Sequence, residues 1–285
     1  MAPLRGLFLR TDGTLRAGWK VGLFLAADRL IEDSVKALLG TKGTLAIAAL
    51  LPRPWVSIFI SLLLSWFFLW LEGRSLPSIG LRLGRRWGNQ CLAGMAGGFL
   101  LMGSVALIVR GLDGFHWVLA PEGGFPALGT GAWLFLVVAL REELLFRGYA
   151  FQRFADGAGE WLALGLASLY FAQAHWDNPG MTGSIRVWAS LNITLAGILL
   201  GLCYLKTRSL ALPIGLHLAW NWTQGCLLGF GVSGINLESF LKPVFHDRPL
   251  WFTGGSFGLE ASLPCAVVCG LAIAGLALWK PRDQA

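Results

Sequence analysis

Residues 54–71 read PWVSIFISLLLSWFFLWL, a stretch that contains no charged side chain. A helix needs about 20 largely apolar residues to cross the hydrocarbon layer of a bilayer. Three further stretches, 88–109, 187–205 and 261–279, are also free of charge. This pattern predicts membrane-spanning helices at these four places.

The composition agrees with a protein built in lipid. Hydrophobic residues make up 55% of the 285-residue chain, charged residues only 14%, and the mean hydropathy is +0.62. Soluble domains carry about 25% charged residues. The 14 Trp and 38 Gly are typical of helices that pack closely in lipid and present aromatic rings at its interfaces. The composition excludes a disordered chain and argues against a soluble α/β enzyme.

Four more apolar stretches are interrupted by polar residues: 17–40, 128–152, 158–176 and 209–230. The first carries Asp28, Arg29, Glu32, Asp33 and Lys36, which favours a tilted or partly interfacial helix. Counting all eight stretches, the sequence predicts an all-α, polytopic integral membrane protein of about eight transmembrane helices. No composition shift or repeat divides the chain, so we expect one transmembrane domain over residues 1–285.

The distribution of basic residues predicts the orientation of the chain. Basic residues collect in cytoplasmic loops of membrane proteins, so the net charge of +7 does not point to nucleic acid as a partner. The predicted outer segments hold six basic residues: Lys42, Arg53, Arg110, Arg186, Lys242 and Arg248. The predicted inner segments hold 13: Arg5, Arg10, Arg16, Lys20, Arg74, Arg82, Arg85, Arg86, Arg153, Lys206, Arg208, Lys280 and Arg282. We therefore expect both termini in the cytoplasm.

Ionisable residues inside a predicted span are the first sign of chemistry, because each costs roughly 3 kcal/mol or more in lipid. The fourth span contains Arg141-Glu142-Glu143-Leu144-Leu145-Phe146-Arg147. Glu143 and Arg147 are four residues apart and can pair on one helical face. Glu142 points about 100° away and has no local partner. The alternative is an interfacial patch where the helix leaves the membrane.

Two later spans carry histidine. His175 ends the fifth span beside Trp176, where an interface anchor is the alternative to a catalytic role. His217 and Asn221 are four residues apart, so both project from one face of the seventh span. Their alternative role is an interhelical hydrogen bond. Together with Glu142 they supply a base, a proton shuttle and oxyanion donors, which are the groups needed to drive water onto an amide.

The two other histidines, His116 and His246, fall in predicted outer loops. Neither has a partner at helical spacing. We expect both to be surface residues.

Three motifs resemble the signature of a known family: Glu142-Glu143-x-x-x-Arg147, Phe171-x-x-x-His175 and His217-x-x-x-Asn221. Their order and spacing resemble the CPBP family of CAAX-protease and bacteriocin-processing intramembrane proteases. This family is also called Abi and includes the type II CAAX prenyl endopeptidases. The resemblance covers about residues 126–230. The first 120 residues and the 231–260 loop carry no family signal beyond hydropathy.

The resemblance implies a role for each motif residue. Glu142 and His175 would activate a water molecule, and His217 and Asn221 would stabilise the oxyanion. Glu143 and Arg147 would orient the first motif, with Phe171 as a supporting residue.

The same residues fit a second chemistry. Two histidines and a glutamate also form a catalytic zinc set, so Glu142, His175 and His217 are alternative zinc ligands. The compact His-Glu-x-x-His helix of many zinc proteases is absent from the sequence. We expect a metal-free, glutamate-based mechanism, with zinc as the open alternative.

These observations predict an intramembrane endopeptidase with its catalytic cavity among the helices, in a bacterial inner membrane. The predicted substrate is a membrane-associated peptide: a prenylated CAAX-type tail, a leader peptide or another membrane protein. The alternative is a non-proteolytic membrane protein, either an ion- or proton-coupled transporter or an immunity or scaffold protein, that uses the same buried polar cluster.

Overall fold

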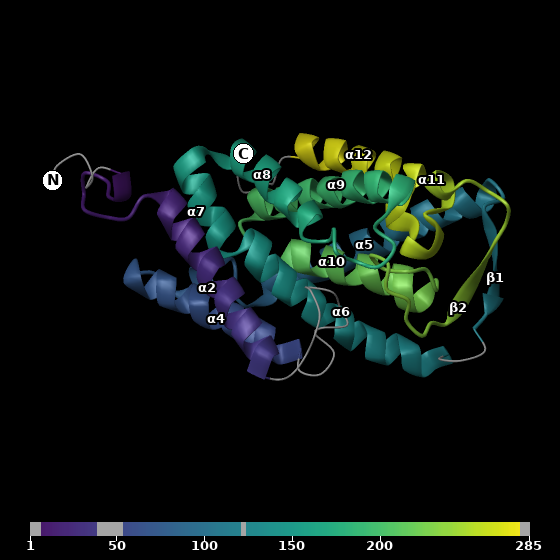
Figure 1. Cartoon of the computed structure of the whole chain (residues 1–285), viewed down its shortest axis with the longest axis horizontal. Helices are drawn as coiled ribbons and strands as arrows, with labels where there is room; N and C mark the ends of the chain where they lie inside the picture. The colour runs from purple at the N-terminus through teal and green to yellow at the C-terminus, as the bar shows by residue number, and fades with distance from the viewer. Residues whose placement is uncertain (1–6, 39–53, 121–123, 280–285) are drawn as a thin grey trace.

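The computed structural model describes residues 7–38, 54–120 and 124–279, and most of them are helical (Figure 1). The main helices are α2 (Ala17–Leu38), α4 (Pro54–Leu71), α5 (Arg85–Gly111), α6 (Gly124–Arg147), α7 (Tyr149–Ala158), α8 (Glu160–Gln173), α9 (Gly183–Thr207), α10 (Ala211–Trp222) and α12 (Leu263–Leu278). Shorter turns of helix are η1 (Leu76–Ile79), η2 (Thr223–Leu227), α11 (Leu250–Thr253), η3 (Gly255–Phe257) and η4 (Leu259–Ala261).

Among the described residues, three helical segments are long and apolar enough to cross a bilayer: Arg85–Gly111, Gly124–Ala158 and Gly183–Thr207. Two shorter apolar helices cover Trp55–Leu71 and Leu263–Leu278. The described residues of each predicted apolar stretch are mostly helical, while the count of eight spans stays a prediction. Five residues used to predict the orientation lie outside the described residues: Arg5, Lys42, Arg53, Lys280 and Arg282.

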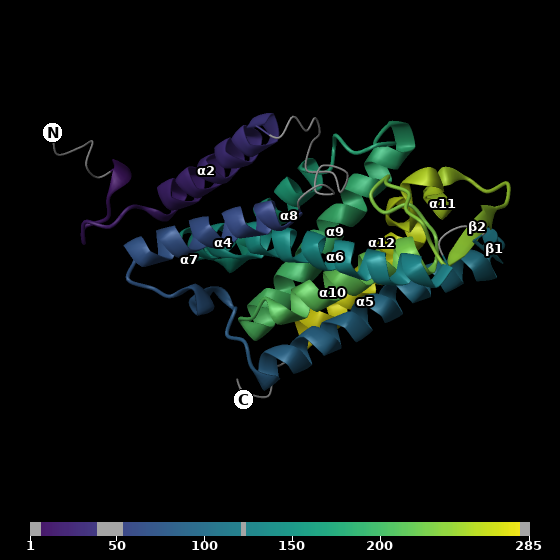
Figure 2. The same cartoon turned by 90° about the horizontal axis from the view of Figure 1, so that it is seen from below.

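Helices α5 and α10 run side by side at close range (Figure 2). A Cβ atom on Gly94 or Gly98 would collide with backbone carbonyl oxygens of α10. A Cβ atom on Gly215 would in turn collide with the carbonyl oxygen of Cys91 on α5. Small residues four apart allow this backbone approach in membrane helices. The contact fixes the position of α10, the helix that carries His217 and Asn221.

The predicted span 128–152 is broken rather than continuous. Helix α6 ends at Arg147 and α7 begins at Tyr149, with Gly148 between them outside the helical backbone region (φ −76°, ψ −134°). A Cβ atom on Gly148 would collide with the carbonyl oxygen of Leu144. The break lets α7 leave the direction of α6 and pack on α2 and α8.

The structure is mostly helical, as predicted, and a two-stranded antiparallel sheet adds a small β element to it. Strand β1 (Phe115–Leu119) pairs with β2 (Leu241–Phe245), two segments predicted to be loops. Phe115 is buried between the rings of Trp117 and Phe230, with ring centroids 4.9 Å apart in both pairs. The sheet therefore joins the α5–α6 connection to the long segment before α12, at one end of the molecule (Figure 1).

The charges of α2 divide between the interior and the surface. Asp28 is only 5% exposed and binds the buried guanidinium of Arg141 on α6 at 2.7 Å. Arg141 also donates to Ser61 Oγ of α4 at 2.7 Å and lies 3.3 Å from Glu32. Arg29 and Asp33 form a separate, exposed pair. The charges that suggested an interfacial helix thus include the partners of a buried arginine.

We expect Asp28→Ala to lower the free energy of unfolding by about 3–5 kcal/mol. The substitution removes the carboxylate that pairs with the guanidinium of Arg141, which stays buried. The matched control is Asp33→Ala on the same helix, whose exposed ion pair contributes under about 1 kcal/mol. Unfolding in mixed micelles measures both. Equal losses in the two variants would contradict a stabilising role for the buried pair.

Candidate active site

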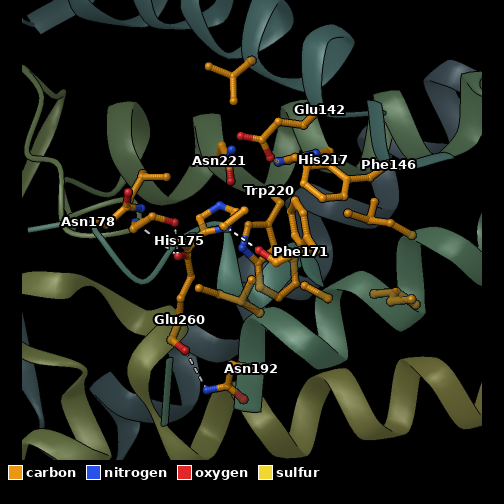
Figure 3. A pocket seen from close by; sticks show the side chains of 18 of the residues that line it. Glu142, Phe146, Phe171, His175, Asn178, Asn192, His217, Trp220, Asn221 and Glu260 are labelled. Atoms are coloured by element: carbon orange, nitrogen blue, oxygen red, sulfur yellow. Dashed lines mark hydrogen bonds and ion pairs between the residues drawn. The ribbon is translucent and has the colours of Figure 1, made fainter. Parts of the chain in front are cut away.

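Three separate helical segments bring the motif residues to one cavity of about 60 Å³ (Figure 3). Glu142 comes from α6, His175 lies two residues beyond the end of α8, and His217 and Asn221 come from α10. The rest of the lining is mostly apolar, with Phe146, Phe171 and other large side chains around the polar groups. The four residues predicted to be catalytic therefore share one enclosure.

Glu143 occupies the most buried position of the first motif. Its side chain is fully buried, and Oε1 accepts a hydrogen bond from Arg147 Nη1 at 3.0 Å. Arg147 also donates to the carbonyl oxygen of Gly197 on α9 at 3.1 Å and lies over the ring of Phe171. The expected i, i+4 pair is present, and it ties α6 to α9.

His217 stands between two carboxylates. Its Nδ1 donates to Glu143 Oε1 at 2.8 Å, and its Nε2 lies 3.7 Å from Glu142 Oε2. The sequence found no local partner for Glu142, and the structure supplies one from another helix. Because Nδ1 faces a carboxylate, it carries the hydrogen, and Nε2 is the ring nitrogen that faces Glu142.

His175 is oriented by its own chain. Its Nδ1 donates to the carbonyl oxygen of Phe171 at 2.7 Å, so Nε2 is the ring nitrogen that does not take part in this hydrogen bond. The Phe171 ring packs against His175, with centroids 4.8 Å apart, and reaches His217 at 6.2 Å. Phe171 is thus the aromatic spacer between the two histidines of the cavity.

The segment before α12 adds polar residues that the sequence analysis missed. Glu260 lines the cavity and accepts hydrogen bonds from the backbone N and the Oγ of Ser233, at 3.1 and 2.8 Å, and from Gln224 Nε2 at 3.1 Å. Asn192 of α9 donates to the carbonyl oxygen of Glu260 at 2.7 Å. The available signal was a lone acidic residue at the start of an apolar stretch.

The zinc alternative meets a geometric difficulty. Within the described ranges, no group of three or more His, Cys, Asp or Glu side chains is arranged to hold a metal ion. The Nδ1 hydrogen bonds of His175 and His217 to protein oxygens are not the obstacle, because a zinc-bound histidine commonly makes such a bond with its second ring nitrogen. Glu142, His175 and His217 as they stand do not fit a zinc site.

His116 is exposed and His246 half-buried, in agreement with the expectation of surface residues, and strand pairing gives both a partner. His116 Nδ1 lies 2.9 Å from His246 Nε2, beside the β1–β2 sheet. His246 Nδ1 contacts Asp113 Oδ1 at 2.8 Å. Their contact depends on strand pairing across 130 residues, which helical spacing does not detect.

Residues 124–223 match the model of a family described as "Type II CAAX prenyl endopeptidase Rce1-like". The match contains all three motifs and confirms the resemblance inferred from them. It identifies this segment as similar to a family of proteases.

A curated protein from Bacillus subtilis (strain 168), described as "Uncharacterized protein YyaK", is 28% identical over 171 residues. The aligned stretch covers 60% of this chain and 50% of that protein, so the chain spans about half the relative's length. No solved structure matches the chain.

We expect Glu143→Ala to lower the free energy of unfolding by about 3–5 kcal/mol, because Arg147 and His217 then lose a buried partner. Glu142→Ala should leave the fold intact, since the Glu142 carboxylate has only the 3.7 Å contact. Unfolding in mixed micelles compares the two. If Glu142→Ala unfolds the protein while Glu143→Ala does nothing, the assigned roles are reversed.

Proposed function

We propose that this chain is an intramembrane endopeptidase that hydrolyses a peptide bond of a membrane-associated substrate by a glutamate-based mechanism. The observation that carries the proposal is the convergence of Glu142, His175, His217 and Asn221 on one cavity within apolar helices. Polar groups at such depth are costly and mark functional sites in membrane proteins. The similarity of residues 124–223 to a protease family selects proteolysis among the functions such a cluster can serve.

The nucleophile is a water molecule held between Glu142 and His175. A cavity of about 60 Å³ has room for a water molecule, which needs about 10–15 Å³. Glu142 takes a proton from the water as its oxygen bonds to the scissile carbonyl carbon. Glu142 passes this proton to Nε2 of His175, and His175 delivers it to the amide nitrogen as the C–N bond breaks, so the amine leaves neutral and both side chains return to their starting states. A carboxylic acid and an amine result.

His217 and Asn221 stabilise the oxyanion of the tetrahedral intermediate. Around His217 lie the carboxylates of Glu142 and Glu143 and the guanidinium of Arg147, which together carry one net negative charge. A doubly protonated His217 neutralises that charge. Its Nε2–H then becomes a donor beside the Asn221 amide, and two donors aimed at one oxygen form an oxyanion hole.

The substrate is a peptide segment that reaches the bilayer: a leader peptide, another membrane protein or a prenylated tail. The proposal places the chain in a bacterial cytoplasmic membrane with both termini inside, as its distribution of basic residues favours. The bilayer and the substrate are the partners of the protein in this proposal. No cofactor takes part, and zinc is the alternative to be tested by chelation.

The test uses the purified protein in detergent with a quenched, membrane-inserting peptide. Loss of the general base in Glu142→Ala should lower kcat about 10²–10⁴-fold. Loss of an oxyanion donor in His217→Ala should lower it about 10²–10³-fold. Activity of the wild-type protein should survive a strong zinc chelator.

Matched controls remove a carboxylate and an imidazole that lie outside the cavity. Glu160→Ala deletes an exposed carboxylate and His246→Ala a histidine outside the cavity, and both should cleave at the wild-type rate. Loss of cleavage on chelation, restored by zinc, would overturn the metal-free mechanism. Absence of cleavage from all peptides tested, or normal cleavage by Glu142→Ala, would overturn the proposed function.

A further inference from the structure

A second cavity, of about 220 Å³, lies between α2, the α6–α7 junction and α8. We call it the α2–α8 groove and define it by Leu25, Phe146, Phe151, Phe154, Ala167 and Tyr170, which line it with four further apolar residues. The tyrosine hydroxyl is the one polar side-chain group among the described lining residues. The groove therefore suits an apolar ligand.

The groove shares a wall with the catalytic cavity. Phe146 lines both cavities, and it lies one helical turn after Glu142 on α6. Its ring packs edge-to-face on Phe171 at 4.9 Å and against Tyr170 at 5.6 Å. A single aromatic side chain thus stands between the apolar groove and the polar site.

The groove has a buried floor and an open rim. Leu145, Ala150 and Phe151 are at most 5% exposed, whereas Leu166 and Tyr170 on α8 are 46% and 43% exposed. The rim lies on the outer face of α8, among other exposed apolar residues such as Leu162 and Leu169. An apolar group can enter from that face without passing a charged residue of the described lining.

We propose that the α2–α8 groove binds a large apolar side chain of the substrate, within a few residues of the cleaved bond. Apolar cavities of about 150 Å³ bind benzene, so 220 Å³ accommodates a Phe- or Leu-sized group. Because Phe146 lines both cavities, a residue a few positions from the scissile bond can reach the groove, at about 3.8 Å of chain per residue.

This inference rests on the proposed function and adds to it a specificity: cleavage next to a bulky apolar residue. The substrate chain is the occupant because the wall shared with the catalytic cavity makes the two sites adjacent. A lipid acyl chain in the groove is the alternative occupant. It would make cleavage independent of the residues that flank the bond.

The test compares quenched peptides that carry Ala, Leu or Phe at each of four positions around the cleaved bond. Wild-type protein should prefer Phe or Leu at one position. Ala167→Leu fills the groove and should reduce the Phe-to-Ala ratio of kcat/KM about tenfold or more, because pocket size sets such ratios. The matched control is Ala274→Leu on the exposed face of α12, which should keep the wild-type ratio.

A second variant tests the groove in case Ala167→Leu does not fold. Phe154→Ala enlarges the groove and should shift the preference from Phe towards Trp. Groove variants that change all peptides in proportion, or none, would overturn the proposal.

Crosslinking separates failure of this inference from failure of the proposed function. Inactive Glu142→Gln protein is illuminated with a peptide that carries benzoylphenylalanine at the preferred position, or at each of the four positions if nothing is cleaved. Crosslinks to Leu25, Phe154 or Tyr170 support the groove even in a protein that cleaves nothing. Crosslinks confined to exposed residues such as Leu271 of α12 overturn it, whatever the activity.

Discussion

The arrangement of the candidate site depends on one buried carboxylate. Glu143 accepts hydrogen bonds from Arg147 and His217 through the same oxygen, and Arg147 continues to the backbone of α9. Glu143 and its partner Arg147 therefore link α6, α9 and α10. Removing one partner of a buried ion pair leaves the other charge unpaired in the interior, which is strongly destabilising, so the three side chains hold one another in place. Glu142 of α6 and His217 of α10, which both face the cavity, are aligned as a result.

The sequence could predict what local spacing determines. Residues four apart on a helix face each other, so the Glu143–Arg147 pair and the shared face of His217 and Asn221 followed from the chain alone. The Glu142–His217 contact did not, because it depends on how α6 and α10 pack. The Asp28–Arg141 pair escaped for the same reason: its members are 113 residues apart, and each looks costly in isolation.

The region of family similarity accounts for the motifs but not for the whole enclosure. Residues 124–223 contain Glu142, His175, His217 and Asn221. The cavity is completed by Ser233 and Glu260, and the neighbouring groove by Leu25 of α2, all outside that region. These three residues belong to segments in which the sequence shows only an apolar stretch or a predicted loop, and no motif. Their placement was unpredictable because it follows from long-range packing rather than from any motif.

The close contact between α5 and α10 has a consequence for motion. Backbone meets backbone at Gly94, Gly98 and Gly215, with no side chain between that could rotate to make room. Sliding one helix along the other would bring carbonyl groups into collision, so the pair behaves as a stationary frame. Any opening that admits a polypeptide has to come from the elements around this frame. The histidine and asparagine of α10 would then stay still while the walls of the chamber move.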